Sequence, residues 1–301
     1  MSEAVPGPVV IGYEGTPSGA DAITLGRWCA RLLGVPAVVA VVHPGPAAIG
    51  PGRVDAEWVA DRHRLAEELL DRARGLVGDD GGGAAGAVEY RVVSSSSAAH
   101  GLHDLAEELS AALIVVGSRA SGPRERLFAG STADRLLSGS GCPVAVAPGG
   151  LHERPSGAPT RIGVAYVDTP DAHAALAFGT VLARRSGTVL RLYTVVAAEA
   201  EVMPLFVGMD AEQAFTTRAR ESFQRALDEA VAGLPPEVKA TGQLLVGHVV
   251  DTLAELGPDD IDLLVCGSRG YGPALRVRLG GVSARLVRAA RSPVAVVPRP
   301  G

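Results

Sequence analysis

The chain has 301 residues, which is enough for two domains of about 150 residues each. Apolar residues make up 47% of the chain and charged residues 20%, so each half can bury a core of its own. The net charge of −5 argues against nucleic acid as the main partner, because nucleic-acid binding requires a basic face. No apolar run is long enough to span a bilayer, and no signal-peptide pattern opens the chain. We therefore expect a cytoplasmic protein that makes no membrane contact.

Predicted strands and helices alternate through the first half. Short apolar runs closed by turn residues predict buried strands at residues 8–15, 35–44, 88–93, 112–117 and 142–148. Helical patterns lie between these strands, at residues 18–33, 55–77, 103–111 and 131–137. Such an alternation predicts a parallel sheet with helices on both faces, an α/β fold.

The second half repeats this order. Strands are predicted at residues 161–170, 188–196, 243–247, 262–267 and 292–298. Helices are predicted at residues 171–185, 211–232 and 250–257, with a last one starting near 282. Residues 150–160 have the composition of a linker, so the predicted domains are residues 1–149 and 161–301. The last strand of each half lies between prolines, as an edge strand would, and the two edges could cover each other.

The longest internal repeat joins the fourth strand of each half to its last strand. Residues 117–148 and 267–298 align without a gap, and 14 of the 32 positions are identical. Each copy has a glycine-rich loop that leads into a helix. A helix start offers free backbone N–H groups and a partial positive charge, which suit a phosphate. Hydroxyl groups of Ser131 and Ser283 could add donors there.

Other phosphate-binding and metal-binding patterns are absent from the sequence. It contains no GxxxxGK[ST] motif, and no GxGxxG follows the first strand. The three cysteines, Cys29, Cys142 and Cys266, have no zinc-type spacing. We therefore expect isolated thiols in a reducing compartment and no metal centre. No Ser/His/Asp set or general base stands in a motif typical of catalysis, so we expect a protein that is not an enzyme.

The second copy reads Gly267-x-x-Gly270, nine residues, then Gly280, and in this it resembles the universal stress protein family. The resemblance covers nearly the whole chain as two tandem domains. It implies two open, Rossmann-like parallel-sheet sandwich domains of five strands each. It also implies binding of ATP, with Mg²⁺ as a companion of the phosphates, and homodimerisation through the last strand, which is common in the family.

The resemblance also implies which residues contact the nucleotide. In the first half these are Gly12, Glu14, Gly117, Arg119, Gly130, Ser131 and Thr132. In the second half they are Ala165, Val195, Gly267, Arg269, Gly270, Gly280, Gly281, Val282 and Ser283. For Arg119 and Arg269, phosphate contact and a solvated position both stay open. Tyr13 and Tyr166 follow the first strand of each half and either line an adenine pocket or pack in the sandwich.

Each copy departs from the family pattern in a different way. In the first copy, Ala120 replaces the second glycine of GxxG, while the acidic Glu14 is in place. In the second copy, Gly281 replaces the usual Ser or Thr, and Val167 occupies the acidic position with Asp168 displaced by one. Which half binds nucleotide therefore stays open.

The expected function is a stress-response regulator that binds nucleotide. Two alternatives stay open: a slow nucleotide-hydrolysing or nucleotidyl-transfer enzyme, and an interaction scaffold without a ligand.

Overall fold

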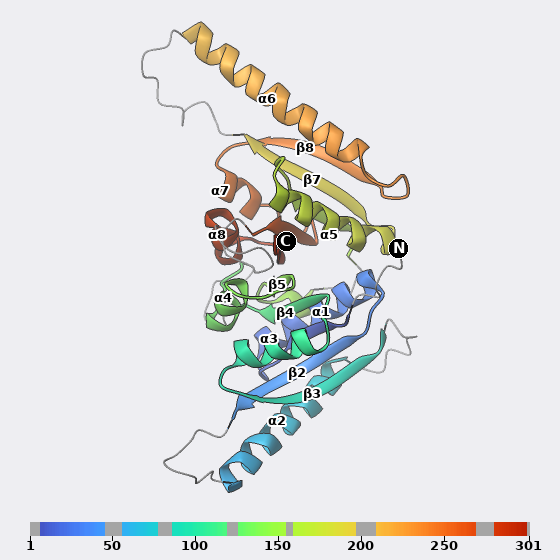
Figure 1. The fold of residues 1–301 in the computed structure, drawn as a ribbon, viewed down its shortest axis with the longest axis vertical. Coiled ribbons are helices and arrows are strands. Elements are labelled where there is room, and N and C mark those ends of the chain that lie inside the picture. The colour runs from blue at the N-terminus through green and yellow to red at the C-terminus, as the bar shows by residue number, and fades with distance from the viewer. Residues whose placement is uncertain are drawn as a thin grey trace.

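The computed structural model describes residues 7–45, 56–77, 86–118, 126–154, 159–196, 209–268 and 280–299. The first half contains β1 (Val9–Gly12), α1 (Pro17–Leu33), β2 (Ala37–Pro44), α2 (Ala56–Val77), β3 (Val88–Ser95), α3 (Ala98–Glu108), β4 (Leu113–Gly117), α4 (Ser131–Leu137) and β5 (Val144–Ala147). The second half contains β6 (Arg161–Ala165), α5 (Pro170–Ser186), β7 (Val189–Val196), α6 (Met209–Ala232), β8 (Ala240–Val246), α7 (Val249–Ala254), β9 (Leu263–Gly267), α8 (Gly281–Ala289) and β10 (Val294–Val297). Helices α2 and α6 lie at opposite ends of the molecule (Figure 1).

The predicted order of strands and α-helices is correct, while several predicted bounds differ from the observed ones; β6, for example, ends at Ala165 and not at residue 170. Helix α3 begins at Ala98, before the predicted 103, and the helix N-cap that the serine run at residues 94–97 indicates in the sequence is Ser97, whose hydroxyl accepts a hydrogen bond from the His100 backbone N–H. Strand β8 begins at Ala240, before the predicted 243, and it lies on an outer edge of the sheet. Edge strands need no continuous apolar run.

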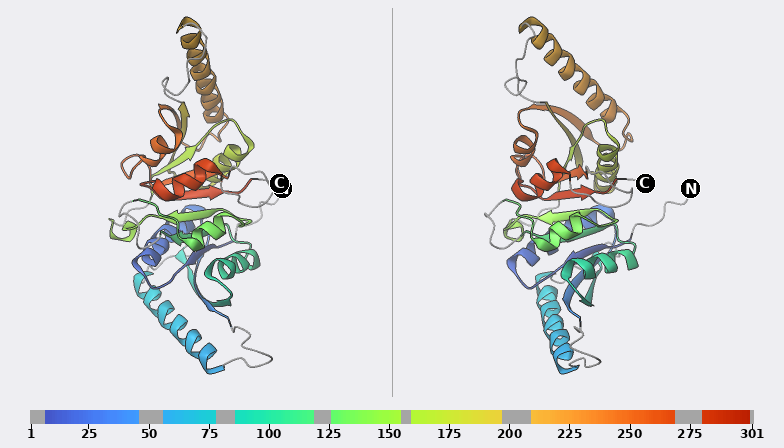
Figure 2. Two further views of the ribbon diagram at one scale, coloured as in Figure 1. Left: turned by 90° about the vertical axis from the view of Figure 1, so that its left-hand side faces the viewer. Right: turned by 60° about the vertical axis from the view of Figure 1, so that its left-hand side comes forward.

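One sheet runs through both halves. Its strand order is β3-β2-β1-β4-β5-β10-β9-β6-β7-β8, so each half contributes five strands. Strands within each half pair in parallel, whereas β5 and β10 pair antiparallel, with Val294 opposite Val146 and Val296 opposite Val144. Figure 2 shows these two strands, green and red, side by side in the middle of the molecule. Because each last strand covers the edge of the other, a homodimer through these strands would have to displace this pairing.

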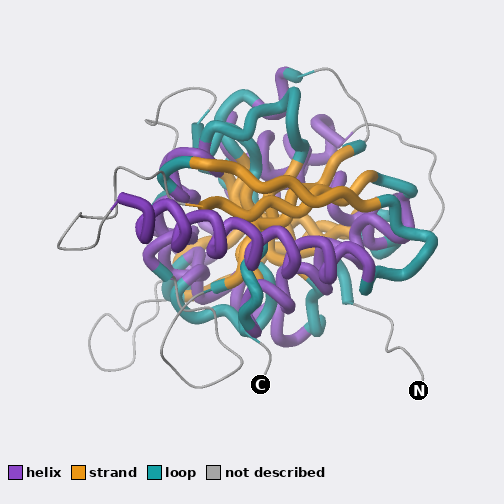
Figure 3. The backbone as a smooth tube through the Cα atoms, turned by 90° about the horizontal axis from the view of Figure 1, so that it is seen from above, coloured by secondary structure: helices purple, strands orange, loops and turns teal. Residues whose placement is uncertain are grey.

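Helices cover the sheet on both faces, as Figure 3 shows. Buried side chains of α1, α2, α5 and α6 form one apolar cluster with one face of the sheet, and those of α3, α4, α7 and α8 form a second cluster on the other face. Each cluster includes residues of both halves, so the two halves share their cores. No helix in the described part of the chain is both long and apolar enough to cross a membrane.

Equivalent residues begin and end the first helix of each half. The hydroxyls of Thr16 and Thr169 accept hydrogen bonds from the backbone N–H groups of Gly19 and Ala172, and a proline follows each threonine. The helices end at glycines in the left-handed region, with φ of 66° at Gly34 and 65° at Gly187. Helices α1 and α5 are therefore fixed at both ends by the same local chemistry.

The segment that leads into α4 is fixed to the second half. The backbone N–H groups of Leu127 and Ala129 donate to the carbonyls of Ala290 (2.7 Å) and Val287 (3.0 Å). The Arg126 guanidinium donates to the Ala289 carbonyl at 3.0 Å and to Glu255 at 2.6 Å. The Leu127 side chain is fully buried. The segment that leads into α4 in the first half therefore packs against α8, the last helix of the second half.

Candidate functional site

In the part of the chain that the structure describes, each half has a cavity beyond the carboxyl ends of its strands. The first pocket has a volume of about 300 Å³ and is lined by the ends of β1 and β4, the middle of β2 and the start of α1. The second pocket has a volume of about 280 Å³ and is lined by the equivalent parts of β6, β9, β7 and α5. The strand order changes direction between β1 and β4, and between β6 and β9. Ligands of open α/β sheets bind at such topological switch points.

Most of the described candidate residues line these pockets. Gly12, Glu14, Gly117 and Thr132 line the first pocket. Ala165, Val195, Gly267, Val282 and Ser283 line the second pocket. Gly130 and Ser131 begin α4, and Gly280 and Gly281 begin α8, next to the lining residues. Arg119, Arg269 and Gly270, and the substituted Ala120, lie outside the described residues.

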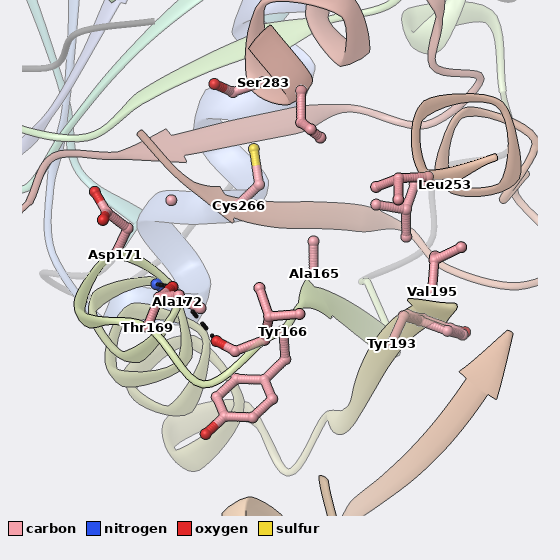
Figure 4. Close-up of a pocket in the computed structure, with 14 residues that line it drawn as sticks. Ala165, Tyr166, Thr169, Asp171, Ala172, Tyr193, Val195, Leu253, Cys266 and Ser283 are labelled. Atoms are coloured by element: carbon pink, nitrogen blue, oxygen red, sulfur yellow. Dashed lines mark hydrogen bonds between the residues drawn. The ribbon is translucent and has the colours of Figure 1, made fainter. Parts of the chain in front are cut away.

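The second pocket has a polar side and an apolar side. Figure 4 shows Asp171 and Ser283 on one side and Val195 and Leu253 on the other. Gly267, where the glycine loop begins, lines the pocket too, and Asp171 is in close contact with it. A ligand with an apolar ring and a polar tail fits this arrangement, with the tail toward the loop.

Gly117 and Gly267 have a packing role that is independent of any ligand. A Cβ atom at Gly117 would overlap the backbone of Ser18, and a Cβ atom at Gly267 would overlap the backbone of Asp171. The first turn of α1 or α5 therefore passes directly against the end of the strand. Only glycine permits this approach at the wall of each pocket.

Ser283 caps its own helix, although the sequence suggested it as a phosphate donor. Its hydroxyl accepts a hydrogen bond from the Gly280 N–H at 3.1 Å and lies 3.3 Å from the Gly280 carbonyl. The side chain is 2% exposed. Ser131 is exposed at the first position of α4. The hydroxyl that α8 carries at 283 therefore points into its own first turn.

The acidic side chains near the first strands are placed differently in the two halves. Glu14 lines the first pocket, and its carboxylate accepts a hydrogen bond from the Thr16 hydroxyl at 3.1 Å. Asp168, one position displaced, instead pairs with His173 at 3.0 Å and is absent from the pocket lining. His173 also bonds the Tyr166 hydroxyl at 3.1 Å. Asp168 therefore does not replace Glu14.

A different acidic residue, Asp171, is among the residues that line the second pocket, and the sequence analysis missed it. Asp171 stands in the first turn of α5, where the first half has Ser18 in α1. The Ser18 hydroxyl donates to the Ser118 carbonyl. The Asp171 Oδ1 atom is buried and has no hydrogen-bond partner within the part of the chain that the structure describes. Aligning the two "TP" helix starts would have revealed the exchange of Ser18 for Asp171.

Burial keeps several pocket side chains uncharged. It raises the pKa of Tyr13, of Tyr166 and of Tyr193, each a pocket-lining phenol. It also raises the pKa of the Cys266 thiol to about 12. These groups hold their protons near neutral pH, so they can donate hydrogen bonds but cannot act as bases. Among the residues described, no group of three or more His, Cys, Asp or Glu could hold a metal ion by itself.

The pocket walls also include apolar residues that the sequence analysis did not single out. Leu102 of α3 and Leu253 of α7 occupy equivalent positions, and Ala40 of β2 is replaced by Tyr193 in β7. In each half the tyrosine after the first strand lines the pocket and is also largely buried. Tyr13 and Tyr166 therefore pack in the sandwich and line a pocket as well, and that the pocket accepts adenine stays a prediction.

A family model described as the universal stress protein family matches residues 7–148 and again residues 159–298. The chain belongs to the universal stress protein family. It is 30% identical over 299 residues to a universal stress protein of Mycobacterium tuberculosis, covering 96% of this chain and 99% of that protein. It is 28% identical over 293 residues to one of Mycolicibacterium smegmatis, covering 94% and 95%. Membership of the family supports a role in the stress response.

Solved structures show the same fold. A universal stress protein from Archaeoglobus fulgidus matches with a TM-score of 0.62 and 18% identity, covering 97% of this chain and 98% of that one. A functionally unknown protein from Pseudomonas aeruginosa matches with a TM-score of 0.58 and 14% identity, covering 97% and 92%. The tandem arrangement of two universal stress protein domains is therefore shared with known structures.

Proposed function

We propose that this universal stress protein binds ATP or a related nucleotide in one or both pockets and regulates the stress response through that binding. The observation that carries the proposal is the position of the pockets. Each lies at the topological switch point of its half, between an apolar wall and the start of the glycine loop. A base and ribose would lie against the wall, and the phosphates would extend toward the loop.

The chemistry of the second pocket supports an anionic group at the loop. Helix α8, of nine residues, begins at Gly281 directly after the glycine loop, and Val282 and Ser283 of its first turn line the pocket. No side chain within the described residues fills the space above Gly281. A phosphate could therefore approach the free N–H groups at this helix start closely.

In the first pocket, the proposal rests on the residues at its mouth. Thr132 offers a hydroxyl from the first turn of α4, and Glu14 offers a carboxylate at the end of β1. A carboxylate in this position is suited to accept hydrogen bonds from a ribose. The two pockets thus support the same class of ligand with different polar groups.

The proposed role is binding and regulation without turnover. The titratable pocket residues with raised pKa values, Tyr13, Tyr166, Tyr193 and Cys266, remain protonated near neutral pH and cannot activate water. We also place the protein in the cytoplasm as part of the proposal. Cys29, Cys142 and Cys266 are free thiols, which suit a reducing compartment.

Calorimetry with nucleotide-stripped protein tests the binding. We expect heat of binding and an upward melting shift with ATP and MgCl₂. Thr132→Trp in the first pocket and Val282→Trp in the second are matched variants that fill equivalent positions, with Thr132→Ala and Val282→Ala as controls for the lost side chain. Each tryptophan variant should lose the part of the binding heat that its filled pocket contributes in the wild-type protein.

A turnover assay separates the proposal from the enzyme alternative. We expect only background phosphate release from ATP, at the same rate with the parent protein, Thr132→Trp and Val282→Trp. Release that disappears in Thr132→Trp or Val282→Trp would instead show catalysis in the pocket. No heat and no melting shift at millimolar ATP would refute nucleotide binding and favour the scaffold.

A further inference from the structure

A further hollow lies at the surface of the second half, and none of the described residues that line the two pockets lines it. It has a volume of about 600 Å³, within the range of about 300–1,000 Å³ that is common for ligand sites. Its apolar walls belong to the first two turns of α5 and to the residue after β10: Pro170, Ala174, Ala177 and Pro298. We call this place the α5 hollow.

An apolar stripe of α5 leads out of the α5 hollow. Pro170, Ala174, Ala177 and Val181 follow one another at intervals of four, three and four residues, which places them on one face of the helix. Ala177 is exposed, and Val181 is 45% exposed. Exposed apolar surface that gathers around a hollow is typical of an interaction site.

The equivalent place in the first half is filled by a turn of the chain itself. Aligning the Thr-Pro starts of α1 and α5 sets Asp21 of α1 opposite Ala174. A short 3₁₀ helix, Leu151–Glu153, follows β5 and packs on α1 there. Its Leu151 side chain is 1% exposed and belongs to the apolar cluster that includes α1. In the first half, this place therefore holds a short peptide turn with an aliphatic side chain.

Asp21 fixes the turn by accepting hydrogen bonds from it. The backbone N–H groups of Gly150 and His152 donate to its carboxylate at 3.1 Å and 2.8 Å, and His152 Nδ1 lies 2.6 Å from the same carboxylate. Asp21 is itself 1% exposed. The first half thus supplies the acid, and the turn supplies the donors.

The second half has the same place without a leucine of its own. Aligning Pro148 and Pro298, which follow β5 and β10, sets Gly301 opposite Leu151. Glycine has no side chain, so this residue cannot supply the apolar group that Leu151 supplies to the first half. The walls of the contact are therefore repeated in the second half, whereas the side chain that fills it is not.

The polar groups of the α5 hollow also differ in sign from those of the first half. Ala174 stands where the first half has Asp21, so the acceptor is missing, and Arg299 and His173 line the α5 hollow. His173 is paired with Asp168 at 3.0 Å. Arg299 is exposed and forms no ion pair with any residue that the structure describes. A segment with a carboxylate beside its aliphatic side chain complements Arg299.

We propose that the α5 hollow is the docking site of a partner protein, which inserts a short segment carrying a leucine-like side chain next to an aspartate or glutamate. The aliphatic side chain lies against Ala174 and Ala177, and the carboxylate pairs with Arg299. The partner thereby makes from outside the contact that the Leu151 turn makes within the chain. This inference goes beyond nucleotide binding and does not depend on it.

Two synthetic peptides test the docking on the full-length protein. One has the sequence of residues 147–153, Ala-Pro-Gly-Gly-Leu-His-Glu, and in the other an aspartate replaces the histidine. NMR of protein with labelled alanine methyl groups follows the signals of Ala174 and Ala177 during each titration. We expect the aspartate peptide to shift both signals and to bind at least about fivefold more tightly than the histidine peptide.

Ala174→Asp restores the acid of the first half and should reverse this preference. The histidine peptide then meets the carboxylate that holds His152 in the parent turn, so it should bind more tightly than the aspartate peptide. Ala60→Asp makes the same exchange at an exposed position of α2, outside the α5 hollow, and should keep the parent's preference. Melting curves show whether each variant is folded.

Two further variants separate the shape of the site from its charge. Ala177→Trp fills the α5 hollow and should abolish binding of both peptides. Arg299→Glu leaves the space open and should weaken binding of the aspartate peptide by about tenfold, with a smaller effect at high salt.

Several results would overturn the inference. These are the absence of methyl shifts with both peptides at millimolar concentration, undiminished binding of an aspartate peptide in which serine replaces leucine, and an unchanged preference in folded Ala174→Asp. Sedimentation of the parent protein checks for a second copy at this site, since a dimer that Ala177→Trp dissociates would assign the α5 hollow to self-association and overturn the inference too. None of these results depends on whether the protein binds ATP, so the proposed function is tested separately.

Discussion

The two pockets are formed by equivalent backbone elements of the two halves, and they differ in their polar side chains. Both lie between the first and fourth strands of their half, and both depend on a glycine that lets a helix start pass close by. The acid, however, stands at the end of β1 in the first half, as Glu14, and in the first turn of α5 in the second, as Asp171. The hydroxyl at Thr132 in the first helix turn has an apolar counterpart at Val282.

This comparison separates what the fold requires from what a ligand would require. Gly117 and Gly267 are present in both halves because packing alone demands them. Glu14, Ser18 and Thr132 are replaced by Val167, Asp171 and Val282 with the frame unchanged. Positions that differ between the halves are therefore the ones at which the two ligand preferences can diverge.

The largest effect is expected from the shared glycines. Gly117→Ala and Gly267→Ala each place a methyl group on the backbone of the adjacent helix start, which has to move. We expect a loss of about 3 kcal/mol or more in the free energy of unfolding for each. Urea denaturation measures this. Gly281→Ala is the control, because its methyl group meets no described atom within 4 Å, and it should be neutral or slightly stabilising. A neutral Gly267→Ala would refute the packing role.

The next effect concerns the segment that leads into α4 in the first half and packs against α8. Leu127 belongs to this segment and is fully buried, so Leu127→Ala should cost about 2–4 kcal/mol. The neighbouring Phe128 is 37% exposed, and Phe128→Ala should cost less than about 1 kcal/mol. Comparing the two by thermal denaturation tests whether the loop is a packed element. Equal losses would contradict the contact described here.

A smaller effect is expected at the helix start of the second half. Ser283→Ala, which copies Ala133 of the first half, removes the hydroxyl that accepts from the Gly280 N–H. The loss of such a cap should lower the free energy of unfolding by about 1 kcal/mol. Because the hydroxyl serves its own helix, ATP affinity should change little. A large loss of affinity with unchanged stability would restore Ser283 as a phosphate donor.

The smallest effect is a pH dependence at the contact between the halves. The hydrogen bond from Arg126 holds the pKa of the Glu255 carboxyl below its ordinary value of 4.5. A lowered pKa means that the carboxylate stabilises the fold above pH 4.5 and that this contribution is lost as the pH falls through the lower folded pKa. Glu255→Gln should therefore be less stable than the parent protein at pH 7 and equal to it in strong acid.

Urea midpoints of the parent and Glu255→Gln proteins at both pH values measure this difference. Because the pair is exposed, added salt should reduce it. A difference that persists in strong acid would mean that Glu255 acts through packing, without its charge.

The sequence predicted the fold closely because its signals are local. The Thr-Pro starts of α1 and α5 and the glycines that end them are readable from residue types alone. The prolines around β5 and β10 indicated two edges in need of cover, and the structure shows them paired. Gly12 and Glu14 line the first pocket and Val195 and Val282 line the second, so these predicted residues gather at cavities, while their contact with a nucleotide stays a prediction.

Other parts of the site could not be predicted, because they depend on contacts between distant segments. The roles of Gly117 and Gly267 come from helix starts about one hundred residues earlier in the chain. Ser283 was expected to face a ligand, but its direction follows from the first turn of α8. The burial of the Asp171 Oδ1 atom, without a hydrogen-bond partner among the residues that the structure describes, follows from the packing of α5 against β9 and cannot be read from the sequence.

The most direct test of nucleotide binding is a calorimetric titration of ATP and MgCl₂ into stripped Thr132→Trp/Val282→Trp protein, beside the parent and the Thr132→Ala/Val282→Ala protein. Both pockets are filled in the tryptophan double variant, while the alanine double variant leaves them open. The account predicts binding to the parent and to the alanine variant, and none to the tryptophan variant when its melting curve shows that it is folded. Parent-like binding by the folded tryptophan variant would contradict it, because the nucleotide would then bind elsewhere.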